Sequence, residues 1–255
     1  MNLVDTHCHI HSNDYQLDAN EVYLSARDAG VDRLICVGTD LEDSKLAVDF
    51  AAKHENVWST IGIHPHEADK FVGHQELLSE FSQLTSAKKV VAIGECGLDY
   101  FYNHSSEKSQ KEILKYQIEL AIENNLPLSF HVREAYDDFW PILDSYPKVR
   151  GVLHSFTDSQ ANLSKAIERG LFIGVNGIAT FTKNEQQINM YKQILLTNLV
   201  LETDSPYLTP VPFRGMICEP KYIKVIADFL ANLRGETSEA IANQTAINAK
   251  SLFKI

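Results

Sequence analysis

The chain has 255 residues, of which 44% are hydrophobic and 22% are charged, a composition typical of a globular protein with one large core. Its formal net charge of -11 argues against a broad basic surface that could grip duplex nucleic acid. A local cationic pocket whose charge comes from metal ions is still compatible with that balance.

The cysteines and the apolar runs indicate in which cellular compartment we expect the protein. The four cysteines are scattered without a Cys-x-x-Cys pair, so we expect reduced thiols in a cytoplasmic protein. No apolar run approaches the roughly 20 residues of a membrane span, and we expect neither a membrane anchor nor a signal peptide.

The first half of the chain alternates short apolar runs with amphipathic stretches. The apolar runs have strand length, whereas the amphipathic stretches carry apolar residues at helical spacing. Gly30 follows the first of these stretches and is a typical helix stop. The expected strands cover 3–5, 33–38, 57–63 and 89–95, and the expected helices cover 21–29, 41–54, 75–84 and 109–124.

The second half continues the same alternation. Pro127 stands at the start of an apolar run, where a strand tolerates proline, and Gly170 closes a helical stretch. The expected strands cover 126–132, 151–154, 171–175 and 199–202, and the expected helices cover 136–146, 159–169, 186–195, 220–233 and 238–253.

Near-continuous apolar strands that alternate with helices eight times predict a closed parallel barrel. No linker, low-complexity tract or charge block divides the chain. We therefore predict an α/β protein built as a single-domain (β/α)8 TIM barrel over residues 1–255.

Histidines and acidic residues gather where the expected strands end, which is where parallel barrels place their chemistry. Taken singly, each could be a hydrogen-bonded structural histidine or a helix cap. Chance would not readily put so many of them at so few positions. They are His7 and His9 after the first strand, His64 and His66 after the third, Glu95, His131 and His154 at the ends of the fourth, fifth and sixth, and Asp204 after the eighth.

Six of these side chains predict a centre with two metal ions. A single tetrahedral catalytic zinc needs only three protein ligands. Two ions about 3.5–4 Å apart that share a carboxylate and a water would use all six. Nitrogen and oxygen donors together suit Zn, Mn, Co, Ni or Fe, and Mg less well. We assign His7, His9 and Asp204 to one ion, His131 and His154 to the other, and Glu95 to the bridge between them.

Six short motifs carry these residues. They occupy positions 5–9, 62–66, 92–99, 127–133, 154–156 and 202–206. Together and in this order they resemble the motifs of the TatD-related metal-dependent deoxyribonucleases, over essentially the whole chain. The resemblance implies a TIM barrel of the amidohydrolase-like group with the dinuclear ligand set given above. It also implies hydrolysis of phosphodiester bonds in DNA, often as a 3'-to-5' exonuclease on single strands.

Two stretches depart from the family's pattern. Asp158 stands where the family has a glycine, and Met216, Ile217 and Cys218 stand where Lys or Arg and then Asn are common. The metal ligands are intact, so we expect hydrolysis to survive. The missing positive charge weakens the expectation of tight nucleic-acid binding.

The expected nucleophile is a water activated by the two bound ions. The expected catalytic residues are Asp204, which would orient that water and accept its proton, and Glu95.

Three further residues are candidate phosphate contacts, namely His64, His66 and Arg133. Arg133 can give bidentate hydrogen bonds to phosphate, and its alternative is an ion pair with Glu134 or Asp137. The aromatic residues at 100–102 could stack on a base or pack at the rim of the site.

The expected substrate is a DNA end or a small phosphodiester, with two divalent ions (Zn, Mn, Mg, Ni or Co) as cofactors of each subunit. The alternative is an esterase, lactonase or aminoacyl-tRNA deacylase of the wider amidohydrolase group. Many such sites bridge their metals through a carbamylated lysine, where this chain has Glu95. A metal-bound scaffold without turnover is the third hypothesis. The oligomeric state is open, and a monomer is compatible with the sequence.

Overall fold

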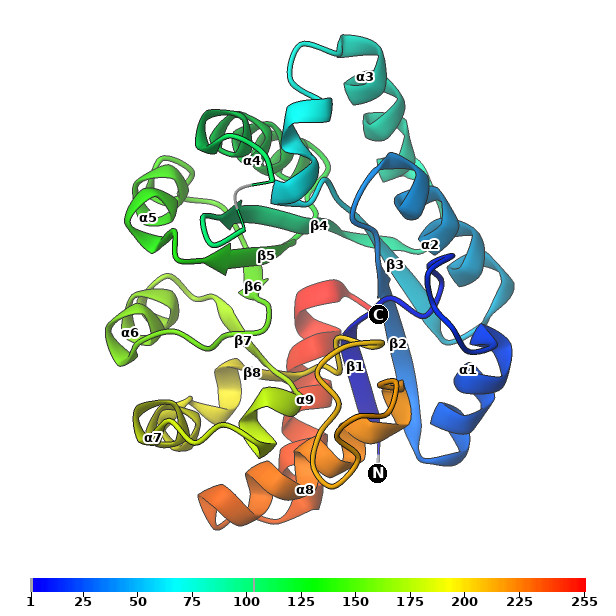
Figure 1. Ribbon diagram of the computed structural model, residues 1–255, viewed down its shortest axis with the longest axis vertical. Helices are drawn as coiled ribbons and strands as arrows, with labels where there is room; N and C mark the ends of the chain where they lie inside the picture. The colour runs from blue at the N-terminus through cyan, green and yellow to red at the C-terminus, as the bar shows by residue number, and fades with distance from the viewer. Residues whose placement is uncertain (1, 103) are drawn as a thin grey trace. The chain divides into compact units, whose positions relative to one another are not determined.

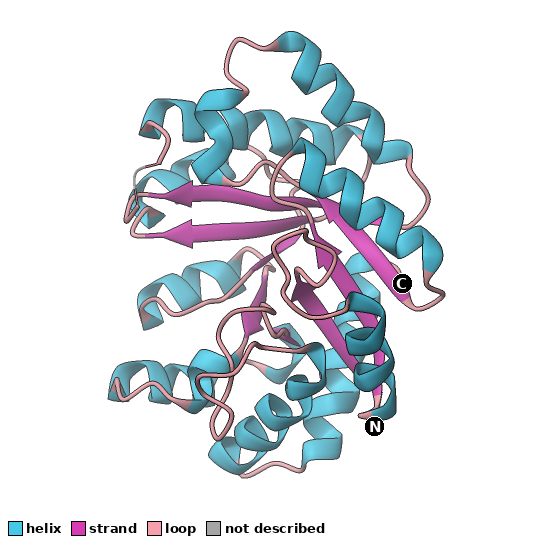
Figure 2. Cartoon of the chain, turned by 45° about the vertical axis from the view of Figure 1, so that its right-hand side comes forward, coloured by secondary structure: helices cyan, strands magenta, loops and turns pink. Residues whose placement is uncertain are grey.

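The computed structural model describes residues 2–102 and 104–255 (Figure 1). They fall into two compact units, the first made of residues 2–36 and 155–255 and the second of residues 37–102 and 104–154. In both units the strands (magenta) are flanked by helices (cyan), as Figure 2 shows. Among the described residues, none of the helices combines the length and apolar character needed to cross a bilayer.

The first unit is built around short, buried parallel strands. Strand β1 (Leu3–Cys8) pairs with β2 (Val31–Val37), and β7 (Phe172–Val175) pairs with β8 (Leu199–Leu201). A parallel bridge between Cys8 and Ser205 joins the end of β1 to the segment after β8. This bridge brings the first and last motifs of the chain together.

In the described part of this unit, five helices accompany the strands, and the last two pack on each other. Helix α9, drawn in red in Figure 1, also packs against β1 and β8. The helices are α1 (Ala19–Asp28), α6 (Gln160–Glu168), α7 (Glu185–Gln193), α8 (Ile223–Arg234) and α9 (Ser238–Phe253), with short 3-10 turns η3 (Gly177–Thr180), η4 (Leu196–Asn198) and η5 (Pro220–Tyr222).

The described residues of the second unit form four parallel strands that are neighbours in chain order. They are β3 (Val57–Ile61), β4 (Val90–Asp99), β5 (Leu128–Arg133) and β6 (Gly151–Leu153). Its helices are α2 (Leu41–Lys53), α3 (Gln75–Gln83), α4 (Glu107–Glu123) and α5 (Tyr136–Asp144), with 3-10 turns η1 (Pro65–Lys70) and η2 (Leu84–Ser86). Helix α2 packs on β3 and α4 on β4.

The alternation of strands and helices predicted from the sequence is confirmed element by element, with ends that move by a few residues. The main difference is the length of β4. We expected this strand to end at Glu95, but it continues to Asp99 because residues 96–99 pair with residues 130–133 of β5. His131 likewise lies inside β5, which ends at Arg133, and His7 lies inside β1.

Gly97 makes the extended pairing of β4 with β5 possible. Its φ is +151°, and a Cβ at this position would lie 1.8 Å from the carbonyl oxygen of His131. Only glycine therefore lets the two backbones approach this closely. The close approach holds Glu95 and Asp99 of β4 beside His131 of β5.

Candidate metal centre

The first unit brings three of the predicted ligands together. His7 Nε2 lies 3.1 Å from His9 Nε2, and Asp204 Oδ1 lies 3.7 Å from the first of these nitrogens and 3.5 Å from the second. Donor atoms around one tetrahedral ion are about 3.4 Å apart, because metal–ligand bonds are about 2.0–2.1 Å long. The triangle formed by the three atoms therefore has the dimensions of a metal site.

The backbone fixes this triangle. The N–H of Asp204 donates to the carbonyl of His7 at 2.8 Å, and the N–H of His9 donates to the carbonyl of Ser205 at 2.7 Å. Asp204 has a positive φ of 59°, a conformation uncommon for a residue other than glycine. Its carboxylate is thus placed by the pairing of the two segments and not by a free loop.

Asp5 ties the same two segments together by hydrogen bonds. Its Oδ1 accepts the N–H of Thr203 at 2.9 Å, and its Oδ2 lies 2.6 Å from the Thr203 hydroxyl. Asp5 is fully buried, and burial raises its pKa to about 8 despite these hydrogen bonds. We therefore regard Asp5 as a positioning residue for His7 and Asp204.

The second unit gathers a second set of predicted residues around one carboxylate oxygen. Glu95 Oε1 lies 2.8 Å from His131 Nδ1, 3.4 Å from His154 Nε2 and 3.5 Å from His64 Nε2. His64, Glu95 and His131 could hold an ion between them, since their donor atoms lie within 4.8 Å of one another. The sequence placed His64 only among the phosphate contacts.

Burial, hydrogen bonds and neighbouring histidines shift the pKa values of this cluster. Burial alone would raise the pKa of Glu95, but His64, His154 and the hydrogen bond with His131 outweigh it and hold that pKa well below its usual range. Burial would lower the pKa of His131, yet its hydrogen bonds with Asp99 and Glu95 raise it. Burial lowers the pKa of His64 to about 4, which leaves a neutral imidazole suited to coordinate a metal.

Asp99 orients two of the histidines. Its Oδ2 lies 3.0 Å from His131 Nε2 and 3.1 Å from His66 Nε2. Burial by itself would raise the pKa of Asp99, but the hydrogen bond with His131 and the backbone N–H of Tyr102 lower it, so the carboxylate stays ionised. A carboxylate on the outer nitrogen of an imidazole is the usual support of a metal-binding histidine. Both donor sets, one in each unit, fit a divalent ion.

Arg133, the third candidate phosphate contact, does not form the ion pair that was its alternative. Among the described residues, its guanidinium has neither Glu134 nor Asp137 as a salt-bridge partner. It lies instead over the rings of Phe101 and Tyr102, at 3.9 and 4.8 Å from their centroids.

The departures from the family's pattern lie in the first unit. Met216 is exposed, whereas Cys218 is buried, so only part of this stretch can face a ligand. Asp158 accepts hydrogen bonds from the N–H of Ser159 and the side chain of Asn162, both at 2.6 Å. It therefore stabilises the start of helix α6.

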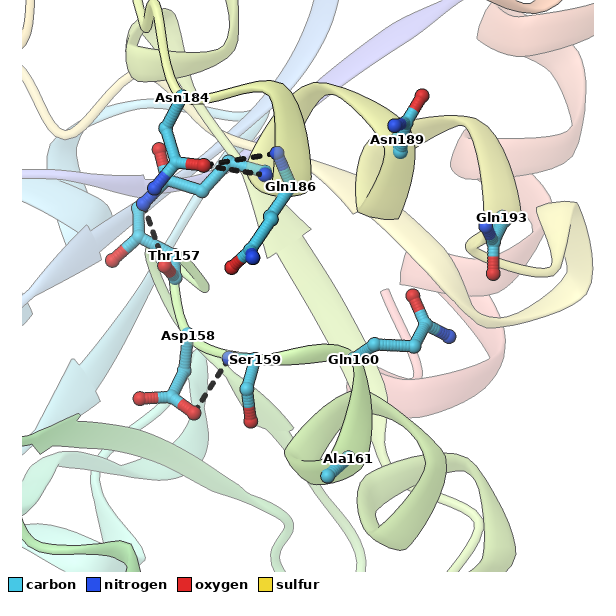
Figure 3. A pocket seen from close by; sticks show the side chains of 10 residues that line it. Thr157, Asp158, Ser159, Gln160, Ala161, Asn184, Gln186, Asn189 and Gln193 are labelled. Carbon is cyan, nitrogen blue, oxygen red and sulfur yellow. Dashed lines mark hydrogen bonds between the residues drawn. The ribbon is translucent and has the colours of Figure 1, made fainter.

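A groove of about 640 Å³ lies beside Asp158, between the start of α6 and helix α7 (Figure 3). Amide and hydroxyl side chains line it, including those of Gln160, Gln186, Asn189 and Gln193. None of the predicted ligands or phosphate contacts is among its lining residues. The groove is therefore not the metal centre.

Sequence reasoning did not assign a role to Asp5 or Asp99. Asp5 belongs to the motif at 5–9 and Asp99 to the motif at 92–99, but neither stands out as a ligand because each supports other residues. The available signal was an acidic residue close in sequence to a predicted ligand. Asp5 is two residues before His7, Asp99 is four residues after Glu95, and both are buried. A buried carboxylate needs polar partners, and here those partners are the site residues or their neighbours.

Known proteins resemble this chain over nearly its whole length. The sequence profile of the family described as TatD related DNase matches residues 4–254. The uncharacterized metal-dependent hydrolase YabD of Bacillus subtilis is 37% identical over 99% of both chains. The 3'-5' ssDNA/RNA exonuclease TatD of Erwinia tasmaniensis is 34% identical over 99% of this chain and 100% of its own.

The fold is shared with solved structures as well. The crystal structure of YJJV, a TatD homolog from Escherichia coli, has a TM-score of 0.92 and 28% identity, and the match covers 99% of this chain and 98% of that one. With eight parallel strands that alternate with helices, this match confirms the predicted (β/α)8 fold class.

Proposed function

Because the chain belongs to the TatD-related DNase family, we propose that it is a metal-dependent hydrolase that cleaves phosphodiester bonds at the ends of single-stranded DNA. The observation that carries the proposal is the convergence of donor atoms on Asp204 Oδ1 in one unit and on Glu95 Oε1 in the other. A relative at 34% identity is named a 3'-5' ssDNA/RNA exonuclease, which supports the same polarity here.

The proposed cofactors are two divalent ions in each subunit. His7, His9 and Asp204 would hold one, and Glu95, His131 and His154 would hold the other, with the bridging role of Glu95 still a prediction from the sequence. Imidazole nitrogens dominate both sets, which favours Zn, Mn, Co or Ni over Mg. Residues 1–255 would act as one catalytic domain.

The bound ions would acidify a water molecule and offset the charge that develops on the phosphate. Asp204 would orient this water and accept its proton as the water oxygen bonds to phosphorus and the ester oxygen leaves. Its backbone hydrogen bonds to the His7 segment hold that carboxylate in place before substrate arrives. His64, His66 and Arg133 would contact the phosphate.

The alternative, an esterase, lactonase or deacylase, finds less support. The strand-four position is Glu95 and not a lysine, and the named relatives with an activity are exonucleases. We place the reaction in the cytoplasm of the cell, in keeping with four cysteines that are all free and buried. A monomer is the proposed working form.

A single-stranded oligonucleotide labelled at either end tests the proposal in Mn, Zn, Co or Mg. We expect mononucleotides to be released from the 3' end, and this release to disappear with a chelator and in Glu95→Gln. Glu123→Gln, an exposed change on helix α4, is the matched control and should behave as wild type. Hydrolysis of lactones or carboxylic esters without any phosphodiester cleavage would contradict the proposal, as would metal binding without turnover.

A further inference from the structure

Two aromatic side chains stand exposed on the turn that follows β4. Phe101 is 49% exposed and Tyr102 is 51% exposed. Their rings meet edge to face, with centroids 4.8 Å apart and planes at 89°. The ring of Tyr102 is also nearly parallel to that of His104, at 17° and 5.8 Å. Two neighbouring exposed rings offer apolar surface to a ligand.

The guanidinium of Arg133 lies over both rings. Its guanidinium carbon lies 3.9 Å from the centroid of Phe101 and 4.8 Å from that of Tyr102. Among residues 2–102 and 104–255, no hydrogen bond or ion pair uses its N–H groups. The N–H donors of this guanidinium are therefore available for an anion such as phosphate.

The exposed turn is fixed to the metal cluster of the same unit by one carboxylate. Asp99 Oδ1 accepts the backbone N–H groups of Phe101 at 3.0 Å and of Tyr102 at 3.1 Å. Its other oxygen contacts His131 and His66, and the ring of His66 lies 5.6 Å from that of Tyr102. The rings are therefore positioned with respect to the histidines that would bind metal or phosphate.

We propose that Phe101, Tyr102 and Arg133 form a nucleotide subsite. The rings would stack on an unpaired base, and the guanidinium would bind a phosphate next to it. This inference rests on the proposed function for the reaction that follows binding. Stacking accepts any base because every base has a flat π face, but it requires a base that is free of its partner strand. The subsite would thus select single-stranded ends without selecting sequence.

Two matched substrates test the subsite: an oligonucleotide with normal nucleotides at both ends, and the same oligonucleotide with tetrahydrofuran abasic residues at both ends. Base stacking on an aromatic side chain changes binding by about 5- to 150-fold per base. We expect kcat/KM of the wild type to fall by a factor in this range on the abasic substrate, mainly through KM. In Phe101→Leu and Tyr102→Leu that difference should shrink toward one, whereas Tyr102→Phe should keep it.

Tyr146→Leu is the control, because Tyr146 is in the same unit but is hydrogen-bonded to Glu119. It should keep the wild-type preference for bases over abasic sites. Equal losses on both substrates in the leucine variants would show a merely structural role and overturn the proposal. An unchanged preference in those variants would overturn it too.

A binding measurement separates this inference from the proposed function. The fluorescence of 2-aminopurine at the ends of a phosphorothioate oligonucleotide, which resists cleavage, should be quenched by wild type and less by Tyr102→Leu. If no phosphodiester is cleaved but quenching depends on Tyr102, the proposed function fails and the subsite stands. If cleavage occurs but quenching does not depend on either ring, the subsite fails alone.

Discussion

At the scale of single residues, one buried carboxylate has two tasks. Asp99 uses Oδ2 for His66 and His131 and Oδ1 for the backbone of the aromatic turn. Its backbone is held in turn by the side chain of Gln110, which contacts both the N–H and the C=O of Asp99. Asp99 therefore cannot rotate to serve one task without losing the other.

The substitution Asp99→Asn separates the two tasks. The amide oxygen can still accept the two N–H groups of the turn, whereas the amide nitrogen now faces His66 and His131. Loss of such a supporting carboxylate typically weakens metal binding or activity by about 10- to 100-fold. We expect a loss of this size in metal titrations and in kcat, with little change in thermal stability.

Asp138→Asn serves as the comparison for this variant. Asp138 is in the same unit but accepts hydrogen bonds from Tyr100 and Lys111, away from the histidines. The variant Asp138→Asn should bind metal as tightly as the wild type does. If Asp99→Asn also bound metal with wild-type affinity, Asp99 would have no orienting role.

At the scale of elements, the sequence predicted the order and type of the strands and helices because the apolar runs are long and regular. It did not predict where β4 ends, since Cys96, Gly97 and Leu98 have no alternation that marks them as strand. Pairing with β5 decides that point, and pairing is not visible in a single sequence.

The candidate site shows the same division. The predicted ligands could be named because histidine and acidic residues near strand ends are conspicuous. The contacts of His64 with Glu95 and of Arg133 with the aromatic rings could not be predicted, because they join segments far apart in the chain. Residue type therefore identified the predicted ligands, but only the fold showed which residues they contact.

Helix α9 offers a test of one such long-range contact. The buried side chain of Asn248 donates to the carbonyl of Leu196 (2.8 Å), the first residue of η4, and to that of Leu199 (2.7 Å), the first residue of β8. Asn248→Ala would remove both hydrogen bonds, leaving the Leu196 carbonyl with only the backbone N–H of Leu199, at a cost of about 2 to 3 kcal/mol in the free energy of unfolding. Thermal unfolding should shift down by about 4 to 10 °C, whereas the exposed change Asn243→Ala should shift it little. A shift as small as that of the control would contradict the assigned role.

At the scale of the whole molecule, the first question is whether the two units fold as one domain. Each unit has its own short parallel strands, and parallel sheets are stable when both faces are covered by neighbouring elements. We therefore predict one cooperative transition in calorimetry, with equal calorimetric and van't Hoff enthalpies. Two resolved transitions, in the metal-loaded and in the metal-free protein alike, would show that the units fold independently.

The net charge makes a second prediction at this scale. With 34 acidic and 23 basic side chains, the chain repels a long polyanion except at local contacts such as Arg133. A nuclease with many phosphate contacts loses about a thousandfold or more in affinity between 50 and 200 mM salt. Here we expect KM for a short oligonucleotide to rise less than about tenfold over that interval. A steeper rise would reveal a basic binding surface.

The division of Asp99 between an aromatic turn and two histidines has a thermodynamic consequence. If an oligonucleotide on the rings steadies this carboxylate, the ions should bind more tightly, and linkage requires the ions to tighten the oligonucleotide by the same factor. Affinities measured in both directions on the wild type should therefore agree. Asp99 would thus couple the binding of an oligonucleotide end at the rings to the binding of metal ions at the histidines.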